Sequence, residues 1–226
     1  MRHARRLVVV TMLWWIGAAT DARAQDERSI YGGALIGIST LSADARASTQ
    51  PGRADVSLYK PENGPALNVF VGAHLARFFS VQANYVWNPN DVSLFGSFVT
   101  AGGGGFYEQS RTVSQHAVVG DALLYFRARG SGIRPYLSTG MGVVRFASAS
   151  ARGDDNGLVA PAGEIRSSRL ALRVAVGIDL VMRDRWSFRY SFSETISGNP
   201  ISTRLIPSGE RNLANFQNLF GVMRRF

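Results

Sequence analysis

Few side chains in this sequence could act as a catalytic base. It contains three histidines, His3, His74 and His116, and no cysteine. Ser114 precedes His116 by two residues, and residues at i and i+2 share one face of a β-strand. A serine beside a histidine can begin an acyl-transfer site, in which the imidazole takes the hydroxyl proton. The sequence places no acidic partner beside this pair, so we predict no catalytic residues.

The patterns for metal and phosphate binding are also incomplete. The two later histidines are far apart, and the carboxylates have no regular ligand spacing. Residues 154–157 read Asp-Asp-Asn-Gly, without the alternate oxygen ligands and terminal glutamate of an EF-hand. The glycine run 102–105 lacks the lysine and serine or threonine that follow in a phosphate-binding loop. We therefore predict no metal site, no cofactor and no cofactor-binding residues, and interpret both segments as turns or flexible loops.

The strongest structural pattern is an alternation of apolar and polar residues over residues 168–193. One face of it carries Leu170, Leu172, Val174, Val176, Ile178, Leu180 and Met182, and after a break at 183–185 it carries Trp186, Phe188, Tyr190 and Phe192. A period of two indicates strands, and the short break indicates an antiparallel hairpin. The first run is longer than an ordinary strand of about five or six residues, and its other face carries arginine and aspartate. This pattern is typical of a strand between lipid and a polar lumen.

The N-terminal residues predict the compartment. Three arginines, Arg2, Arg5 and Arg6, precede the apolar stretch 7–19, and residues 22–24 (Ala-Arg-Ala) match a small-x-small cleavage site. The apolar stretch is shorter than the roughly twenty residues of a spanning helix. We expect residues 1–24 to be a cleaved signal peptide, with an N-terminal anchor as the alternative, and residues 25–226 to be one domain in the bacterial cell outer membrane.

Eight segments read as strands, and the connections between them alternate in length. The predicted strands are 29–39, 66–75, 79–88, 113–126, 133–146, 168–182, 186–193 and 212–226. The short connections are 76–78, 127–132 and 183–185, and the long ones are 40–65, 89–112, 147–167 and 194–211. This pattern predicts an all-β fold, an eight-stranded antiparallel transmembrane β-barrel with short periplasmic turns and four long extracellular loops. Pairing of the last strand with the first removes the exposed edges.

The second and third predicted strands support the same fold. With a turn at 76–78, the outward residues Leu67, Val69, Val71 and Ala73 lie opposite Trp87, Tyr85, Ala83 and Val81. Phe70 then faces Asn84 and Gly72 faces Gln82 on the inside. Trp87 and Trp186 lie at opposite ends of the wall, where aromatic girdles occur. The faces of the fourth strand stay open, because Asp121 shares its parity with Leu123 and Tyr125.

Two motifs resemble those of a known family. Arg134-Pro135-Tyr136 followed by Gly140-x-Gly142 is similar to the start of the fifth strand in small outer-membrane β-barrel proteins related to the membrane domain of outer-membrane protein A. The terminal Phe226, with Phe216, Phe220 and Val222 at the same parity, resembles the signal for barrel assembly, although Asn218 and Arg224 depart from it. The resemblance implies a monomeric barrel that contacts the barrel assembly machinery, outer-membrane lipid and lipopolysaccharide.

Lipid A deacylase barrels resemble this chain in architecture. Their catalytic strand is similar to the segment containing Arg189, Tyr190, Phe192, Ser193 and Glu194. Phe192, however, stands where the histidine base would lie. We therefore predict that the protein is not an enzyme. A lipid A-modifying acyl hydrolase or transferase is an alternative, with Ser114 and His116 as the only candidate pair.

The expected interior and loops indicate the function. Arg173, Arg189, Asp121 and Asp179 should point inward, and Asp179 should lie opposite Arg189 near the periplasmic end. Eight strands leave an interior about wide enough to be filled by side chains, so these charges should pair and plug the lumen. A narrow, porin-like channel is the alternative.

We thus predict a structural or surface-binding scaffold that acts through its extracellular loops. The long segment 93–107 carries Leu94, Phe95, Phe98, Val99, Phe106 and Tyr107, which form either a partner site or a strand extension above the membrane. An extracellular ligand of these loops is one expected partner. The net charge is +9, but the basic residues form no run typical of nucleic-acid binding, so nucleic acid is not expected.

Overall fold

The structure, a computed structural model, describes residues 29–42, 58–60, 62–100, 103–148, 165–183, 185–198 and 212–226. These residues form nine strands: β1 (Ser29–Ser42), β2 (Leu58–Lys60), β3 (Glu62–His74), β4 (Phe79–Thr100), β5 (Gly103–Tyr125), β6 (Ile133–Ser148), β7 (Ile165–Val181), β8 (Trp186–Gly198) and β9 (Asn212–Arg225). No helix in the described segments is long and apolar enough to cross a membrane. The predicted signal peptide lies outside the described residues, as do residues 154–157.

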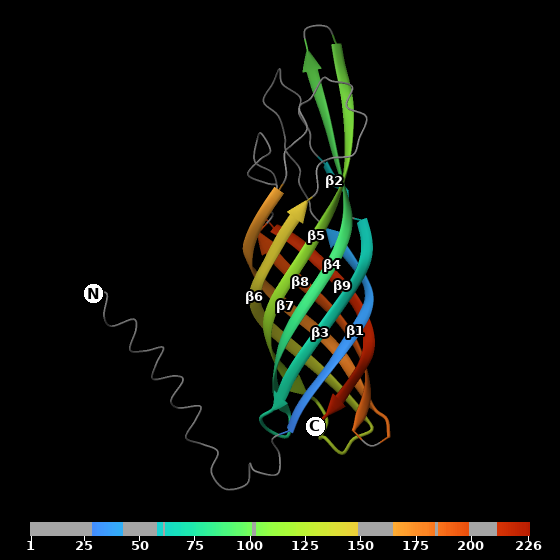
Figure 1. Ribbon diagram of the computed structural model, residues 1–226, viewed down its shortest axis with the longest axis vertical. Coiled ribbons are helices and arrows are strands. Elements are labelled where there is room, and N and C mark those ends of the chain that lie inside the picture. The colour runs from blue at the N-terminus through green and yellow to red at the C-terminus, as the bar shows by residue number, and fades with distance from the viewer. Residues whose placement is uncertain are drawn as a thin grey trace, which may run out of the picture.

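The eight long strands close into an antiparallel barrel (Figure 1). Around the wall their order is β4-β3-β1-β9-β8-β7-β6-β5, and β5 pairs again with β4. The first and last strands pair, with Ile36 opposite Phe220, as the sequence predicted. The start of β1 and the end of β9 lie at the same end of the barrel as the short connections. All eight predicted strands are confirmed, and several extend further at the opposite end.

The predicted long loop 89–112 is wrong, because most of it continues strands β4 and β5 as a paired hairpin beyond the other strands. β4 and β5 remain paired from Asn90 opposite Val113 to Thr100 opposite Gly103, and β2 pairs with β4 at the level of Phe95. The strand extension that the sequence left as an alternative is therefore confirmed. The side chains of residues 92–100 and 104–111, on which an apolar partner surface would depend, lie outside the described part.

Pro89 explains why the sequence suggested an end to the strand. Proline has no N–H to donate and occurs in sheets only where that group is not needed. The β3–β4 ladder stops at Leu67 opposite Trp87, two residues before Pro89. The carbonyl of Pro89 lies on the β3 side, since a Cβ added at Gly64 would meet it at 2.1 Å. Its ring therefore interrupts only the side where pairing has already ended.

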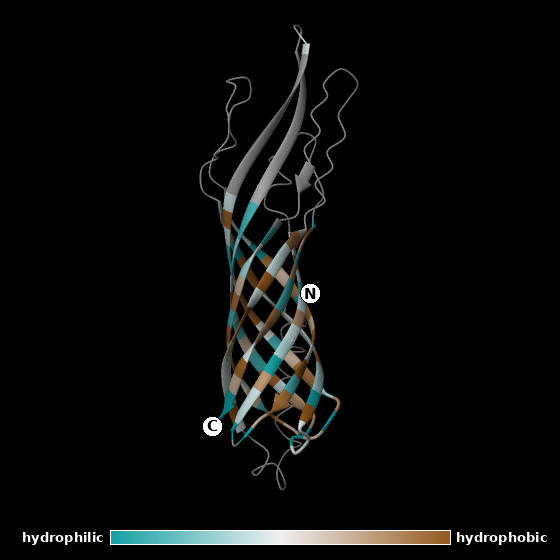
Figure 2. Cartoon of the chain, turned by 90° about the vertical axis from the view of Figure 1, so that its right-hand side faces the viewer, coloured by the Kyte–Doolittle hydropathy of each residue, from teal (hydrophilic) through white to brown (hydrophobic). Residues whose placement is uncertain are grey.

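The outer and inner faces of the wall differ as predicted. On β7 every second residue from Leu170 to Met182 is directed outward, and Leu170 is 83 % exposed. This run spans about 40 Å along the strand, or about 30 Å along the barrel axis for a tilt of about 40°, close to the height of a lipid-facing band. Apolar residues recur around the wall at this level (Figure 2). Trp87 and Trp186 are both exposed on the outer face.

The four predicted inward charges are buried as two ion pairs and occupy only part of the interior. Its extracellular half is lined by an apolar cluster of Leu41, Val86, Val113, Ala117, Val119, Val144, Phe146, Ala171 and Leu213. Strand β5 contributes Val113, Ala117 and Val119 to this cluster. The same inner face of β5 also carries Asp121, Leu123 and Tyr125. Their shared parity is the ambiguity that left the faces of this strand open. Among the described side chains, the buried charged residues lie in the middle and the periplasmic half.

Candidate functional site

The periplasmic half of the lumen contains the predicted ion pair between β7 and β8. Asp179 and Arg189 are directly opposite in the register, and their side chains are 0 % and 1 % exposed. Arg189 Nε donates to Asp179 Oδ1 at 2.6 Å, and Nη2 donates to Oδ2 at 2.8 Å. This bidentate geometry is the strongest form of arginine–carboxylate contact. The prediction of this pair and of its register is confirmed.

Arg189 also reaches across the barrel. Its Nη1 donates to Gln82 Oε1 at 2.7 Å, and β8 is four strands away from β4 in either direction around the wall. Its Nη2 donates to the Tyr125 hydroxyl at 2.8 Å, while that hydroxyl donates to Asp179 at 3.1 Å. The guanidinium lies 4.9 Å from the ring centroids of both Phe70 and Tyr136. One buried cation thus joins opposite walls of the lumen.

A second ion pair lies above the first. Arg173 Nη1 on β7 donates to Asp121 Oδ2 on β5 at 2.6 Å, although β6 separates these strands. The β6 residue between them in the register is Gly140. A Cβ added at Gly140 would lie 2.0 Å from Asp121 Oδ1. The ion pair therefore passes over a position that has no side chain.

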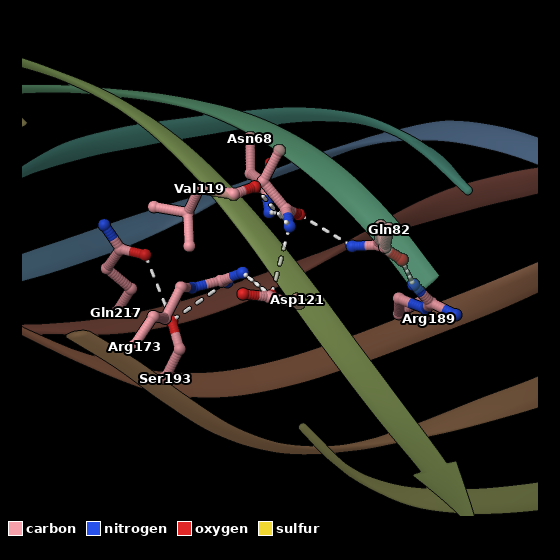
Figure 3. A network of polar contacts seen from close by, with 9 residues as sticks. Asn68, Gln82, Val119, Asp121, Arg173, Arg189, Ser193 and Gln217 are labelled. Carbon is pink, nitrogen blue, oxygen red and sulfur yellow. Dashed lines mark hydrogen bonds and ion pairs between the residues drawn. The ribbon is translucent and has the colours of Figure 1, made fainter. Parts of the chain in front are cut away.

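Amides connect the Arg173–Asp121 pair to Arg189 of the first pair, so that both pairs belong to one network (Figure 3). Asn84 Nδ2 donates to Asp121 Oδ2 at 3.1 Å, and Gln82 Nε2 donates to Asn84 Oδ1 at 2.6 Å. On the other side, Arg173 Nη2 donates to Ser193 Oγ at 3.3 Å, and that hydroxyl donates to Gln217 at 3.0 Å. Buried charges require such partners, because an unpaired one is strongly destabilising. The network spans the middle of the lumen and contains no activated nucleophile.

A further hydrogen bond crosses the extracellular half. Asn215 Nδ2 on β9 donates to Gln115 Oε1 on β5 at 3.1 Å, and these strands are also four positions apart around the barrel.

Below the network, Arg134 is buried with its guanidinium carbon 3.9 Å from the centroid of Tyr125. The sequence identified Arg134 only as part of a family motif. Arg134 and Tyr136 are two residues apart on β6 and therefore share one face of the strand, and this spacing could have predicted that Arg134 points inward.

The two histidines of the described chain lie on opposite faces of the wall. His74 is buried in the lumen, where its Nδ1 is hydrogen-bonded to Ser80 Oγ. His116 faces outward, and its Nε2 lies 3.1 Å from Ser114 Oγ, so the predicted shared face is confirmed. The other imidazole nitrogen contacts the Tyr85 hydroxyl at 2.8 Å rather than a carboxylate. The Ser–His pair therefore lacks the acidic orienting group of the usual triad.

The segment that resembles a deacylase strand is divided between the two faces of β8. Ser193 is buried and bonded to Gln217, whereas Phe192 is directed outward and stacks on Phe216 with centroids 6.4 Å apart. Glu194 follows the outward parity of Phe192, so Ser193 and Glu194 do not share a face. In the described segments, no three histidine, cysteine, aspartate or glutamate side chains are grouped as a metal site would require.

A closed barrel with a lipid-facing band and a charged, hydrogen-bonded interior defines a transmembrane β-barrel of the outer-membrane type. Residues 9–226 match the family described as outer membrane protein beta-barrel domain, and the chain belongs to this family. The protein is accordingly a component of the bacterial outer membrane. No curated protein matches the chain.

Two solved structures share the fold. Neisserial surface protein A is 12% identical over 87% of this chain and 97% of its own, with a TM-score of 0.54. The outer membrane protein OprG from Pseudomonas aeruginosa is also 12% identical, over 88% of this chain and 96% of its own, with a TM-score of 0.56. At this identity the likeness establishes the fold alone. The predicted architecture and its family resemblance are confirmed.

Proposed function

We propose that this protein is a non-conducting, non-enzymatic scaffold of the outer membrane that binds a partner through its extracellular part. The observation that carries the proposal is the projecting β4–β5 hairpin. Its strands stay paired for ten further residues beyond Asn90, which is about 33 Å of additional strand. Figure 1 shows this hairpin rising well above the other strands. A paired extension of this length is not required to close the barrel.

The interior supports a scaffold rather than a pore. Arg189 is bonded to both Asp179 and Gln82, so it occupies the centre of the lumen from wall to wall. Arg173 and Asp121 fill the next level. Ions crossing the barrel would have to displace both buried pairs. The surface that remains for function is therefore the extracellular one, where β2 adds a third strand to the hairpin.

The register allows the hairpin to be removed without disturbing the barrel. Val92 lies opposite Arg111, and Asp91 lies opposite Thr112. Replacing residues 93–110 by Asn-Gly would join Val92 to Arg111 through a two-residue turn, the shortest hairpin connection. A matched control replaces residues 127–132, a connection at the opposite end of the barrel, by a Gly/Ser segment of equal length.

The test compares adhesion of cells that express the full chain, the trimmed chain or the control. We expect the trimmed chain to enter the outer membrane and to lose adhesion to an epithelial monolayer and cell–cell aggregation, while the control keeps whichever of these the full chain confers. Equal adhesion and aggregation by the trimmed and full chains would contradict the proposal. A stable ion current through the full chain would instead favour the channel.

A further inference from the structure

A second polar cluster lies on the outer wall, at the extracellular edge of the apolar band. It consists of Tyr85 and Trp87 on β4 and of Ser114 and His116 on β5. Below it on β5 the outward residue is Val118, which is 62 % exposed. Just above it, the Thr112 hydroxyl donates to Asp91 Oδ1 at 2.9 Å. The cluster therefore lies at the boundary between the acyl-chain region and the headgroup region of the outer leaflet.

The four side chains form one chain of hydrogen bonds. Trp87 Nε1 donates to Ser114 Oγ at 3.3 Å, Ser114 Oγ lies 3.1 Å from His116 Nε2, and His116 Nδ1 lies 2.8 Å from the Tyr85 hydroxyl. With a neutral imidazole these groups own four donor hydrogens: the indole N–H, two hydroxyls and one imidazole N–H. Three contacts use three of them. In either tautomer of His116, one hydroxyl hydrogen is left for an acceptor outside the protein.

Arg145 supplies a positive charge on the strand next to this cluster. It lies on β6 directly opposite His116 in the register, and residues so paired have Cα atoms about 4.5 to 5.5 Å apart. Its side chain is exposed on the outer face, and it forms no ion pair with a residue in the described segments. Asp91 lies further up the wall, beyond Ser114, and accepts the Thr112 hydroxyl.

We propose that Arg145 and the cluster of Tyr85, Trp87, Ser114 and His116 bind the phosphate of a phosphorylated lipid headgroup in the outer leaflet. A phosphate has the acceptors and the negative charge that this combination lacks. Val118 and Val143, the outward residues immediately below, are exposed for contact with the acyl chains of the same molecule. This inference rests on the outer-membrane location and is independent of the scaffold function.

The experiment measures lipid retained by the purified full chain after release from detergent micelles, by native mass spectrometry. The probe is bisphosphorylated lipid A, and the comparison lipid is the same molecule without phosphates. The variants are Arg145→Gln, which removes the charge, and Tyr85→Phe, which removes only a hydroxyl. The control, Arg183→Gln, removes an equal charge from an exposed position at the periplasmic turn. Retarded gel mobility after boiling shows that each variant was folded.

We expect Arg145→Gln to weaken retention of lipid A about tenfold, Tyr85→Phe to weaken it about threefold, and Arg183→Gln to leave it unchanged. Dephosphorylated lipid A should be retained by every variant at the low level of Arg145→Gln. Unchanged retention in both Arg145→Gln and Tyr85→Phe would overturn the proposal, and so would an equal loss in Arg183→Gln. Displacement of lipid A by millimolar inorganic phosphate would overturn it in favour of a free-phosphate site.

Discussion

Gly140 should be indispensable to the Asp121–Arg173 ion pair, and Gly140→Ala tests this directly. The added Cβ would lie 2.0 Å from Asp121 Oδ1, 2.4 Å from the Gly120 carbonyl oxygen and 2.9 Å from the Asp121 Cα. Two of these three atoms belong to the backbone of β5, which cannot rotate away as a side chain can. The strand or the carboxylate must therefore move.

The expected cost follows from these contacts. Overpacking a close-packed interior destabilises by about 1 to 3 kcal/mol. If the displaced carboxylate also leaves Arg173, a buried charge loses its partner, and the loss rises to about 3 to 5 kcal/mol. The neighbouring Gly120→Ala is the matched control, because nothing lies within 4 Å of a Cβ there. It should change the free energy of unfolding by less than about 0.5 kcal/mol.

The assay is equilibrium unfolding by urea of the barrel in lipid vesicles, followed by tryptophan fluorescence. A double-mutant cycle with Asp121→Asn separates the two contributions, since an effect exerted through the ion pair is not additive with loss of the carboxylate. If Gly140→Ala proves no less stable than Gly120→Ala, the claim that a missing side chain makes room for this ion pair is refuted.

Three further predictions follow from the same interior and register. Gly177→Ala should destabilise by about 1 to 3 kcal/mol in the same urea assay, because its Cβ would lie 2.4 Å from the Tyr136 ring; stability equal to the unmodified chain would contradict the packing. Asp179→Asn should cost about 3 to 5 kcal/mol, since it leaves Arg189 without its carboxylate; a loss below about 1 kcal/mol would show that the pair is solvated. Replacement of residues 93–110 by Asn-Gly should preserve the gel-mobility shift on boiling, and a chain that no longer shifts would show that the hairpin is needed to close the barrel.

Strand pairing was predictable where the two faces of a strand differ strongly. On β7 the outward residues are large and apolar, while arginine and aspartate alternate with small residues inside. A slip of one residue would have placed Asp179 in lipid, so the two faces exclude any other register. With the turn fixed at 183–185, Asp179 then had to lie opposite Arg189. The same argument correctly paired β3 with β4.

The sequence was less informative where both faces are mixed. On β5 the inner face carries Val113 and Val119 as well as Asp121, and the outer face carries Gly120 and His116. Parity alone could not choose between these faces. Nor could it show which side of the strand Pro89 interrupts, because that depends on where the β3–β4 ladder ends.

Contacts across the lumen were beyond any local pattern. The bond from Arg189 to Gln82 joins residues 107 positions apart, and it exists only because the barrel closes with eight strands. The hydrogen-bond chain through Tyr85, Ser114 and His116 was partly visible, since the sequence placed Ser114 and His116 on one face. Tyr85 joins them only once the β4–β5 register is known.

Ion conductance across a planar lipid bilayer tests most directly the claim that the lumen is closed by side chains. The purified full chain, inserted at single-molecule density in 1 M KCl to screen surface charge, should show no stable current steps. Persistent open-channel steps from the unmodified chain would contradict the account, because Arg189 and Gln82 could not then remain joined across the lumen.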